Sequence, residues 1–284
     1  LRTVAPVAQP SRPHALQFPF GTQAAMWAWR TLFFRPGVYE PQSERSVEWN
    51  RGAYLVQGLG HCGACHTPRN ALGAARNSQW LAGGMIPVQN WYAPALHSER
   101  EAGVASWPVE EVAELLQTGV APRGSVLGPM AEVVAGSTQY LSDSDARAMA
   151  IYLRSLPPRI EQALAPATKM DENVRARGAK LFETHCASCH GKSGEGERGA
   201  FPALAGNRAV LMDNPTNLVR ALLQGGYPPS TAGHPRPHGM PPFQQLLSDI
   251  DMAALASYIR NAWGNAAAPV ATIEVHRVRE RRSP

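Results

Sequence analysis

The pentapeptide Cys-x-x-Cys-His occurs twice in this chain, at residues 62–66 and 186–190. The two copies use all four cysteines of the sequence. Two thiols separated by two residues can each form a thioether bond to one porphyrin, and the adjacent histidine can then bind its iron. The pattern therefore predicts two covalently attached c-type haems. The attachment residues are Cys62, Cys65, Cys186 and Cys189.

Two other kinds of site use the same spacing of cysteines. A Cys-x-x-Cys pair can be a redox dithiol, and two such pairs can form a four-cysteine zinc site. The histidine after each pair has no part in a four-cysteine zinc site, and the flanking residues do not predict the strand and helix that frame a thioredoxin-like dithiol. Haem is the interpretation that we favour. Because c-type haem is attached after export, we expect the protein to be periplasmic.

The sequence also contains an internal repeat. The two motifs lie 124 positions apart in a chain of 284 residues, which suggests two domains of ordinary size. The sequence Arg-Gly-Ala precedes each motif, at residues 51–53 and 177–179. After each motif, a middle region rich in Gly and Pro leads to a serine with an aspartate three positions later, which signals the start of a helix. These serines are Ser142 and Ser248.

Each copy is therefore predicted to consist of an opening helix, the haem motif, a loop-rich middle and a closing helix. We expect Gly52 and Gly178 in the opening helices to let the closing helices approach, with Tyr152 and Tyr258 as packing partners. The predicted fold class is mainly α, with small, loop-rich helical domains in tandem, each around one covalent haem. The expected boundaries are 45–160 and 161–268 for the two haem domains, 1–44 for the segment before them and 269–284 for a basic C-terminal tail.

One axial ligand of each iron is the histidine of the motif, His66 or His190. The sixth ligand has to come from the loop-rich middle, and we predict Met130 for the first iron and Met240 for the second, because both precede a closing helix. A methionine beside the histidine raises the reduction potential and leaves no open position on the iron. A backbone carbonyl is expected to accept a hydrogen bond from each proximal histidine. Position in the chain suggests the carbonyls of Pro68 and Pro202, and the rival sixth ligands are Met85, Met149, Met212, Met252, His234 and His238.

Both ends of the chain have a distinctive composition. The net charge of +5 comes largely from arginines near the C-terminus, which we interpret as a solvated terminus, with docking on a membrane or a partner as the alternative. Nothing else favours binding to nucleic acid. Aromatic residues near the N-terminus are expected either to pack between haem domains or to dock on a partner subunit or a membrane surface. The arginines are Arg277, Arg279, Arg281 and Arg282, and the aromatic and apolar cluster comprises Phe18, Phe20, Met26, Trp27, Trp29, Leu32, Phe33 and Phe34.

The beginning of the chain resembles the end of a closing helix. Residues 1–6 are similar in pattern to residues 153–158, and the sequence shows neither an initiating methionine nor a signal peptide. We therefore expect a preceding domain of the same kind, and with it a third haem, in a longer native polypeptide. No stretch of about 18 apolar residues predicts a transmembrane helix, so association with the inner membrane is expected to be peripheral.

Longer segments of the chain resemble class I cytochrome c domains, arranged as in the multihaem cytochrome c subunits of bacterial periplasmic dehydrogenases. Residues 33–37, 48–56, 128–134, 239–243 and 258–265 carry the resemblance. The resemblance implies an electron-transfer subunit that is not itself an enzyme. Its electrons would come from a catalytic dehydrogenase subunit that is a quinoprotein, a flavoprotein or a molybdenum hydroxylase. The acceptor would be a quinone, an oxidase or another cytochrome of the respiratory chain. Members of this family usually have three haem domains, whereas this sequence has two haem motifs.

Two other functions stay open. A dihaem peroxidase or haem oxidoreductase would act on substrate at one iron and would need an open axial position, with His97, His234 or His238 as a distal acid or base. A free dihaem shuttle would transfer electrons without forming a stable complex. Two low-spin, six-coordinate irons would favour electron relay over the enzyme. Copurification with a large catalytic subunit would distinguish the relay subunit from the free shuttle.

Overall fold

The computed structural model describes residues 3, 5–159 and 170–280, and the chain separates into two compact units, Leu1–Glu40 and Pro41–Pro284. The expected boundary at 160–161 lies outside the described residues, as do Arg281 and Arg282 and positions 1, 2 and 4 of the N-terminal match. No helix in the described ranges is long and apolar enough to cross a membrane.

The first unit contains helix α1 (Gln23–Phe33). The helix begins where the hydroxyl of Thr22 accepts a hydrogen bond of 3.2 Å from the amide of Ala25. No residue of α1 is buried, and Trp27 is 71% exposed. The aromatic cluster of the sequence is therefore largely a surface feature of this unit.

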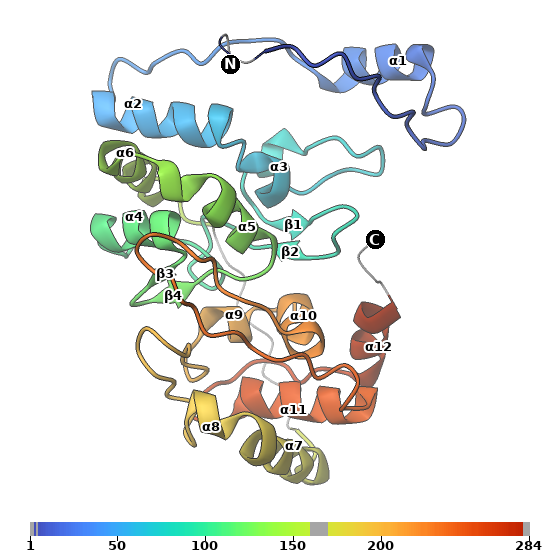
Figure 1. Cartoon of the computed structure of the whole chain (residues 1–284), viewed down its shortest axis with the longest axis vertical. Helices are drawn as coiled ribbons and strands as arrows, with labels where there is room; N and C mark the ends of the chain where they lie inside the picture. The colour runs from blue at the N-terminus through green and yellow to red at the C-terminus, as the bar shows by residue number, and fades with distance from the viewer. Residues whose placement is uncertain (1–2, 4, 160–169, 281–284) are drawn as a thin grey trace. The chain divides into compact units, whose positions relative to one another are not determined.

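The second unit is mainly helical, as the sequence predicts, and two short β-hairpins are its strand pairs among the described residues (Figure 1). Its first half has an opening helix, a short motif helix, two hairpins and a closing helix. These elements are α2 (Val47–Tyr54), the π-helical η1 (Leu55–Leu59), α3 (Gly63–His66), the 3₁₀ helix η2 (Asn77–Gln79), β1 (Gly84–Met85), β2 (Tyr92–Ala93), α4 (Val109–Thr118), β3 (Val120–Ala121), β4 (Gly124–Ser125), α5 (Pro129–Gly136), the 3₁₀ helix η3 (Thr138–Tyr140) and α6 (Asp143–Arg154).

The second half repeats the order of opening helix, motif helix and closing helix, without strands among its described residues. Its elements are α7 (Glu172–His185), α8 (Ala187–His190), α9 (Arg208–Leu211), α10 (Thr216–Gln224), α11 (Asp249–Asn261) and α12 (Thr272–Glu280). The core of this half includes Phe182 of α7, Leu222 of α10 and Leu255 of α11. In each half the opening helix lies against the closing helix, α2 against α6 and α7 against α11 (Figure 1).

The glycines of the opening helices lie at these helix crossings, which confirms the expectation from the sequence. A Cβ atom at Gly52 would lie 1.9 Å from the carbonyl oxygen of Ala148 and 3.0 Å from Cβ of Tyr152. A Cβ atom at Gly178 would lie 2.4 Å from the carbonyl oxygen of Ala254 and 2.6 Å from Cβ of Tyr258. Because neither backbone can rotate out of the way, only glycine allows the helices to come this close.

The closing helices begin at the predicted serines. The hydroxyls of Ser142 and Ser248 each accept a hydrogen bond of 3.2 Å from the amide three residues on, that of Asp145 or Asp251. Each of these aspartates also forms an ion pair of 2.7 Å with the arginine before the glycine, Arg51 or Arg177. The cap that starts the closing helix thus also fastens it to the opening helix.

The basic C-terminal segment is not a solvated terminus over its described part. Residues 272–280 form helix α12, in which Val275 is fully buried. Arg279 is bound through all three of its nitrogens, whereas Arg277 is exposed. The expectation of a frayed tail is therefore wrong for this helix, because apolar residues between the charged ones give α12 a face that the core can bury.

Candidate haem-binding sites

The first motif forms a single helical turn. The carbonyl of Cys62 accepts backbone hydrogen bonds from Cys65 (3.3 Å) and His66 (3.0 Å), which brings the two thiols and the imidazole together. Trp80 covers this turn: a Cβ atom at Gly63 would lie 2.2 Å from the Trp80 ring. The motif is thus held between the opening helix and the loop that follows it.

The imidazole of His66 is fixed by one hydrogen bond. Its Nδ1 lies 2.7 Å from the carbonyl oxygen of Pro94, and burial lowers the pKa of His66. A carbonyl can only accept, so Nδ1 carries the proton and the lone pair of Nε2 remains for a metal. The prediction of Pro68 for this carbonyl is therefore wrong. The β1–β2 hairpin separates the motif from Pro94, and local spacing does not reveal that its end folds back onto His66.

The second motif has the same geometry. The carbonyl of Cys186 accepts hydrogen bonds from Cys189 (3.2 Å) and His190 (2.9 Å). The Nδ1 atom of His190 lies 2.9 Å from the carbonyl oxygen of Pro202, which confirms the expectation for this residue. Both copies therefore place, beside two thiols on one helical turn, an imidazole whose Nδ1 binds a proline carbonyl.

The surroundings of the four cysteines do not suit a redox dithiol. Burial raises the pKa of the thiols of Cys62 and Cys186 to about 11. A redox-active cysteine needs a lowered pKa, because the thiolate is the nucleophile. Within residues 5–159 and 170–280, no three or more side chains of His, Cys, Asp and Glu are grouped as a metal site would require, so the two pairs do not form one zinc centre. The thiols and the carbonyl-bound imidazoles fit covalent haem.

The two predicted methionine ligands lie in half-buried positions, each in a constrained backbone. Met130 is the second residue of α5 and follows Gly128, whose φ of 60° is left-handed. Met240 pairs with Gly226 through two backbone hydrogen bonds of 2.8 and 3.0 Å. Their binding to iron stays a prediction.

Most of the rival ligands are buried in the core or contact other groups of the protein. Met149, Met212 and Met252 are buried in the core, at most 6% exposed. The Nε2 atom of His234 lies 3.1 Å from the carbonyl oxygen of Gly199, and the ring of His238 lies 5.0 Å from that of Phe201. Met85 is 39% exposed. The choice of Met130 and Met240 over these alternatives rests on their positions in the sequence repeat.

A contact between the two halves was not predicted from the sequence. The side-chain amide of Asn217 in α10 pairs with the backbone of Tyr92 in β2, accepting from its N–H (2.9 Å) and donating to its carbonyl (2.7 Å). The guanidinium of Arg220 lies 5.2 Å from the centre of the Trp91 ring. This contact lies just before Pro94, so α10 of one half touches the segment that orients the histidine of the other.

Comparison with known proteins agrees with this chemistry. A family model described as cytochrome c matches residues 175–263. The cytochrome c subunit of the quinone alcohol dehydrogenase of Gluconobacter oxydans is 37% identical over 300 residues, which cover 99% of this chain and 62% of the relative. The fructose dehydrogenase cytochrome subunit of Gluconobacter japonicus is 35% identical (97% of this chain, 61% of the relative). A nicotinate dehydrogenase subunit of Pseudomonas putida is 39% identical (97% and 24%). The chain thus spans less than two thirds of the length of these relatives.

Proposed function

We propose that this chain, which matches a cytochrome c model over residues 175–263 and is similar to the cytochrome c subunits of bacterial dehydrogenases, is an electron-transfer subunit. It would relay single electrons through two c-type haems from a catalytic dehydrogenase subunit to the respiratory chain. Cys62, Cys65, Cys186 and Cys189 would hold the haems. The axial ligands would be His66 and Met130 for the first iron and His190 and Met240 for the second.

The observation that carries this proposal is the repeated contact between a motif histidine and a proline carbonyl. His66 with Pro94 and His190 with Pro202 have the same atoms in the same roles at both motifs. The carbonyl fixes the tautomer and the orientation of the ring and makes Nε2 a better ligand. Bound haem supplies one-electron chemistry, and its potential depends on the axial ligands and on burial. An iron with both axial positions filled by the protein suits electron transfer rather than catalysis on substrate.

The relatives support a dehydrogenase complex, with the substrate chosen by the other subunit. Their names refer to alcohol, fructose and nicotinate dehydrogenases. As the resemblance in sequence implies, the catalytic partner would be a quinoprotein, a flavoprotein or a molybdenum hydroxylase. A quinone, an oxidase or another cytochrome would accept the electrons. The length of the relatives is compatible with a third haem domain in a longer native polypeptide.

The proposed location is the periplasm, with peripheral attachment to the inner membrane. The first unit supports this attachment, since it exposes Phe18 and Trp27 and has Arg30 and Arg35 in the same segment of the sequence. Aromatic residues and arginines together are typical of segments that lie at a membrane surface. Binding of the purified protein to vesicles of anionic lipid, compared with neutral lipid, would test the attachment.

A spectrum of the purified protein tests the function most directly. We expect a haem-to-protein ratio of two and the weak far-red band of methionine-ligated ferric haem. Replacing both cysteines of either motif by alanine should halve the haem content. A high-spin iron, or rapid binding of carbon monoxide to the reduced protein as isolated, would instead favour a dihaem peroxidase or haem oxidoreductase. Copurification of the tagged protein with a catalytic subunit would distinguish the relay subunit from a free shuttle.

A further inference from the structure

The C-terminal helix α12 is built into the second haem domain, although the electron-transfer function assigns it no role. Val275 is fully buried, and Val278 packs against the same core as Met240. The link from α11 to α12 is also fixed, because the hydroxyl of Ser257 accepts a hydrogen bond of 2.9 Å from the amide of Val270. Helix α12 is thus packed on the core and fixed to α11.

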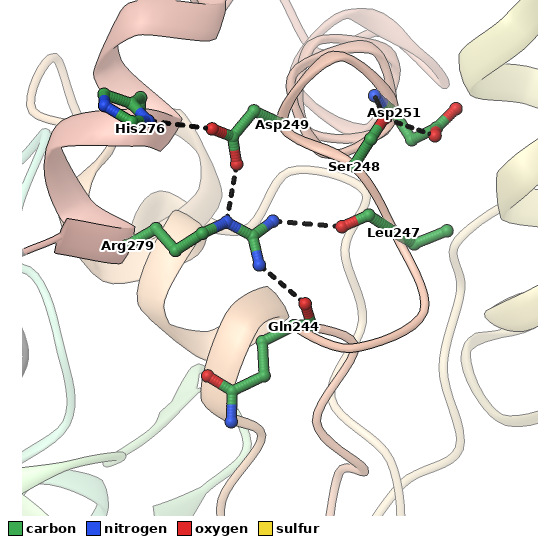
Figure 2. Close-up of polar contacts among 7 residues, drawn as sticks. All are labelled: Gln244, Leu247, Ser248, Asp249, Asp251, His276 and Arg279. Carbon is green, nitrogen blue, oxygen red and sulfur yellow. Dashed lines mark hydrogen bonds and ion pairs between the residues drawn. The ribbon is translucent and has the colours of Figure 1, made fainter.

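Arg279 makes the main polar contacts of α12 (Figure 2). Its Nε donates to Oδ1 of Asp249 at 2.6 Å, and its two terminal nitrogens donate to the carbonyls of Gln244 (2.6 Å) and Leu247 (3.0 Å). The side chain is only 25% exposed. His276, one turn earlier in α12, lies 3.2 Å from the other oxygen of Asp249. The planar guanidinium thus binds three groups with fixed directions, which a lysine cannot reproduce.

The loop that Arg279 binds begins at Met240. At this end the loop is held by the two backbone hydrogen bonds between Met240 and Gly226. Pro241 and Pro242 follow, and neither has an N–H to donate. The two prolines stiffen the loop, but they leave its position dependent on contacts further along the chain.

The far end of the loop has two sets of attachments. The amides of Phe243 and Gln244 donate to carbonyls of α10 at 3.0 and 3.1 Å. The carbonyls of Gln244 and Leu247 accept from Arg279, and beyond them the loop enters α11 at Asp249. The loop of residues 240–248 is therefore hydrogen-bonded to α10 on one side and to α12 on the other.

We propose that Arg279 is a positioning residue for Met240: helix α12 fixes the loop of residues 240–248, and this holds the sulfur of Met240 at the second iron. The inference rests on the proposed role of Met240 as sixth ligand. It predicts that the strength of methionine ligation at the second iron depends on a side chain near the C-terminus that contacts neither the haem motif nor Met240 itself.

The test uses the holoprotein of this 284-residue chain, which has two haem motifs, carrying Met130→His, so that the far-red band reports Met240 alone. Three variants are added to this background: Arg279→Gln, Arg279→Lys, and Arg277→Gln as the matched control. Arg277 lies on the same helix and carries the same charge but is exposed. The readout is the temperature at which the far-red band disappears, with far-UV circular dichroism to follow helix content.

We expect Arg279→Gln to lower that temperature by about 5 °C, Arg279→Lys to lower it by less, and Arg277→Gln to leave it unchanged. If Arg279→Gln does not fold, Arg279→Lys carries the test. An unchanged band in both Arg279 variants, or an equal shift in Arg277→Gln, would overturn the positioning role. Met240→Ala in the same background separates the two ideas: if the band persists there, the ligand assignment itself is wrong, and the inference fails with it.

Discussion

Replacement of Gly52 by alanine gives a sharp test of how the opening and closing helices cross. The added Cβ would lie 1.9 Å from the Ala148 carbonyl oxygen, and ordinary contact begins near 3.4 Å, so α2 and α6 would have to separate by about 1.5 Å. The corresponding separation for Gly178→Ala is about 1.0 Å, because the distance to the Ala254 oxygen is 2.4 Å. The obstacle in both cases is backbone, which no change of rotamer relieves.

The expected cost follows from two opposing contributions. Overpacking of a well-packed core costs about 1–3 kcal/mol, and a clash with backbone belongs at the upper end of this range. Alanine in place of glycine inside a helix contributes about 1 kcal/mol in the other direction. We therefore expect Gly52→Ala to lower the free energy of unfolding of the half that contains α2 and α6 by about 2 kcal/mol, and Gly178→Ala to lower that of the half that contains α7 and α11 by somewhat less.

Guanidinium unfolding of the holoprotein, followed by circular dichroism, would measure this change. With a slope of about 4 kcal/mol per M, a loss of 2 kcal/mol moves the midpoint by about 0.5 M. The control is Gly136→Ala at the end of α5, where a Cβ atom would meet nothing within 4 Å and φ is not left-handed. That variant should be slightly more stable than the parent. If Gly52→Ala is as stable as Gly136→Ala, the argument from the helix crossing is refuted.

Three further changes have expected outcomes. The hydrogen bond from Arg51 lowers the pKa of Asp145, so the stability that this pair contributes is present above the ordinary aspartate pKa and is lost as the pH falls through the lowered value. Because the pair is partly exposed, Arg51→Gln should lower the free energy of unfolding by only about 0.5 kcal/mol at pH 7 and by less at pH 2, measured by guanidinium unfolding at both values. Arg260→Met should cost at least about 3 kcal/mol by the same assay, because three carbonyls that the buried guanidinium binds at 2.7–2.8 Å lose their donor. Asn217→Leu should raise the amide hydrogen-exchange rate of Tyr92 about tenfold or more, since it leaves that N–H without its acceptor; an unchanged rate would show that the contact between the two halves is not formed in solution.

The features that could be predicted from the sequence are those that both copies repeat locally. The serine caps at Ser142 and Ser248 and the glycines at the helix crossings follow from spacing within a single helix or from one-to-one comparison of the two copies. The carbonyl of Pro202 was predictable because it lies 12 residues from His190. Contacts between segments that are far apart in the sequence could not be predicted in this way.

Pro94 and Arg279 show why the remainder escaped prediction. The carbonyl of Pro94 reaches His66 only because the β1–β2 hairpin turns back, and the register of two-residue strands leaves almost no pattern in a sequence. Arg279 belongs to a run of arginines that reads as a charged tail, and only the burial of Val275 shows that the run is a helix docked on the core. In both cases the contact joins two segments whose separation along the sequence does not indicate that they meet in the fold.

The two copies share the features that the fold requires and differ in features that distinguish their two sites. Both copies have the glycine crossing, the capped closing helix, its ion pair to the opening helix, and a histidine held by a proline carbonyl. Among the described residues, the β1–β2 hairpin lies between motif and carbonyl in the first copy and is bound by Asn217, whereas the second copy has there a single bridge between Glu197 and Phe201. Helix α12, with Arg279 on the methionine loop, belongs to the second copy. The shared features place two thiols and a histidine on one helical turn in each copy, whereas the unshared ones contact the segment just before Pro94 in the first copy and the loop that begins at Met240 in the second. Since axial-ligand geometry and hydrogen bonding around it set the potential of a haem, we expect two haems bound at these motifs to differ in reduction potential, and a redox titration that resolves a single midpoint would contradict this reasoning.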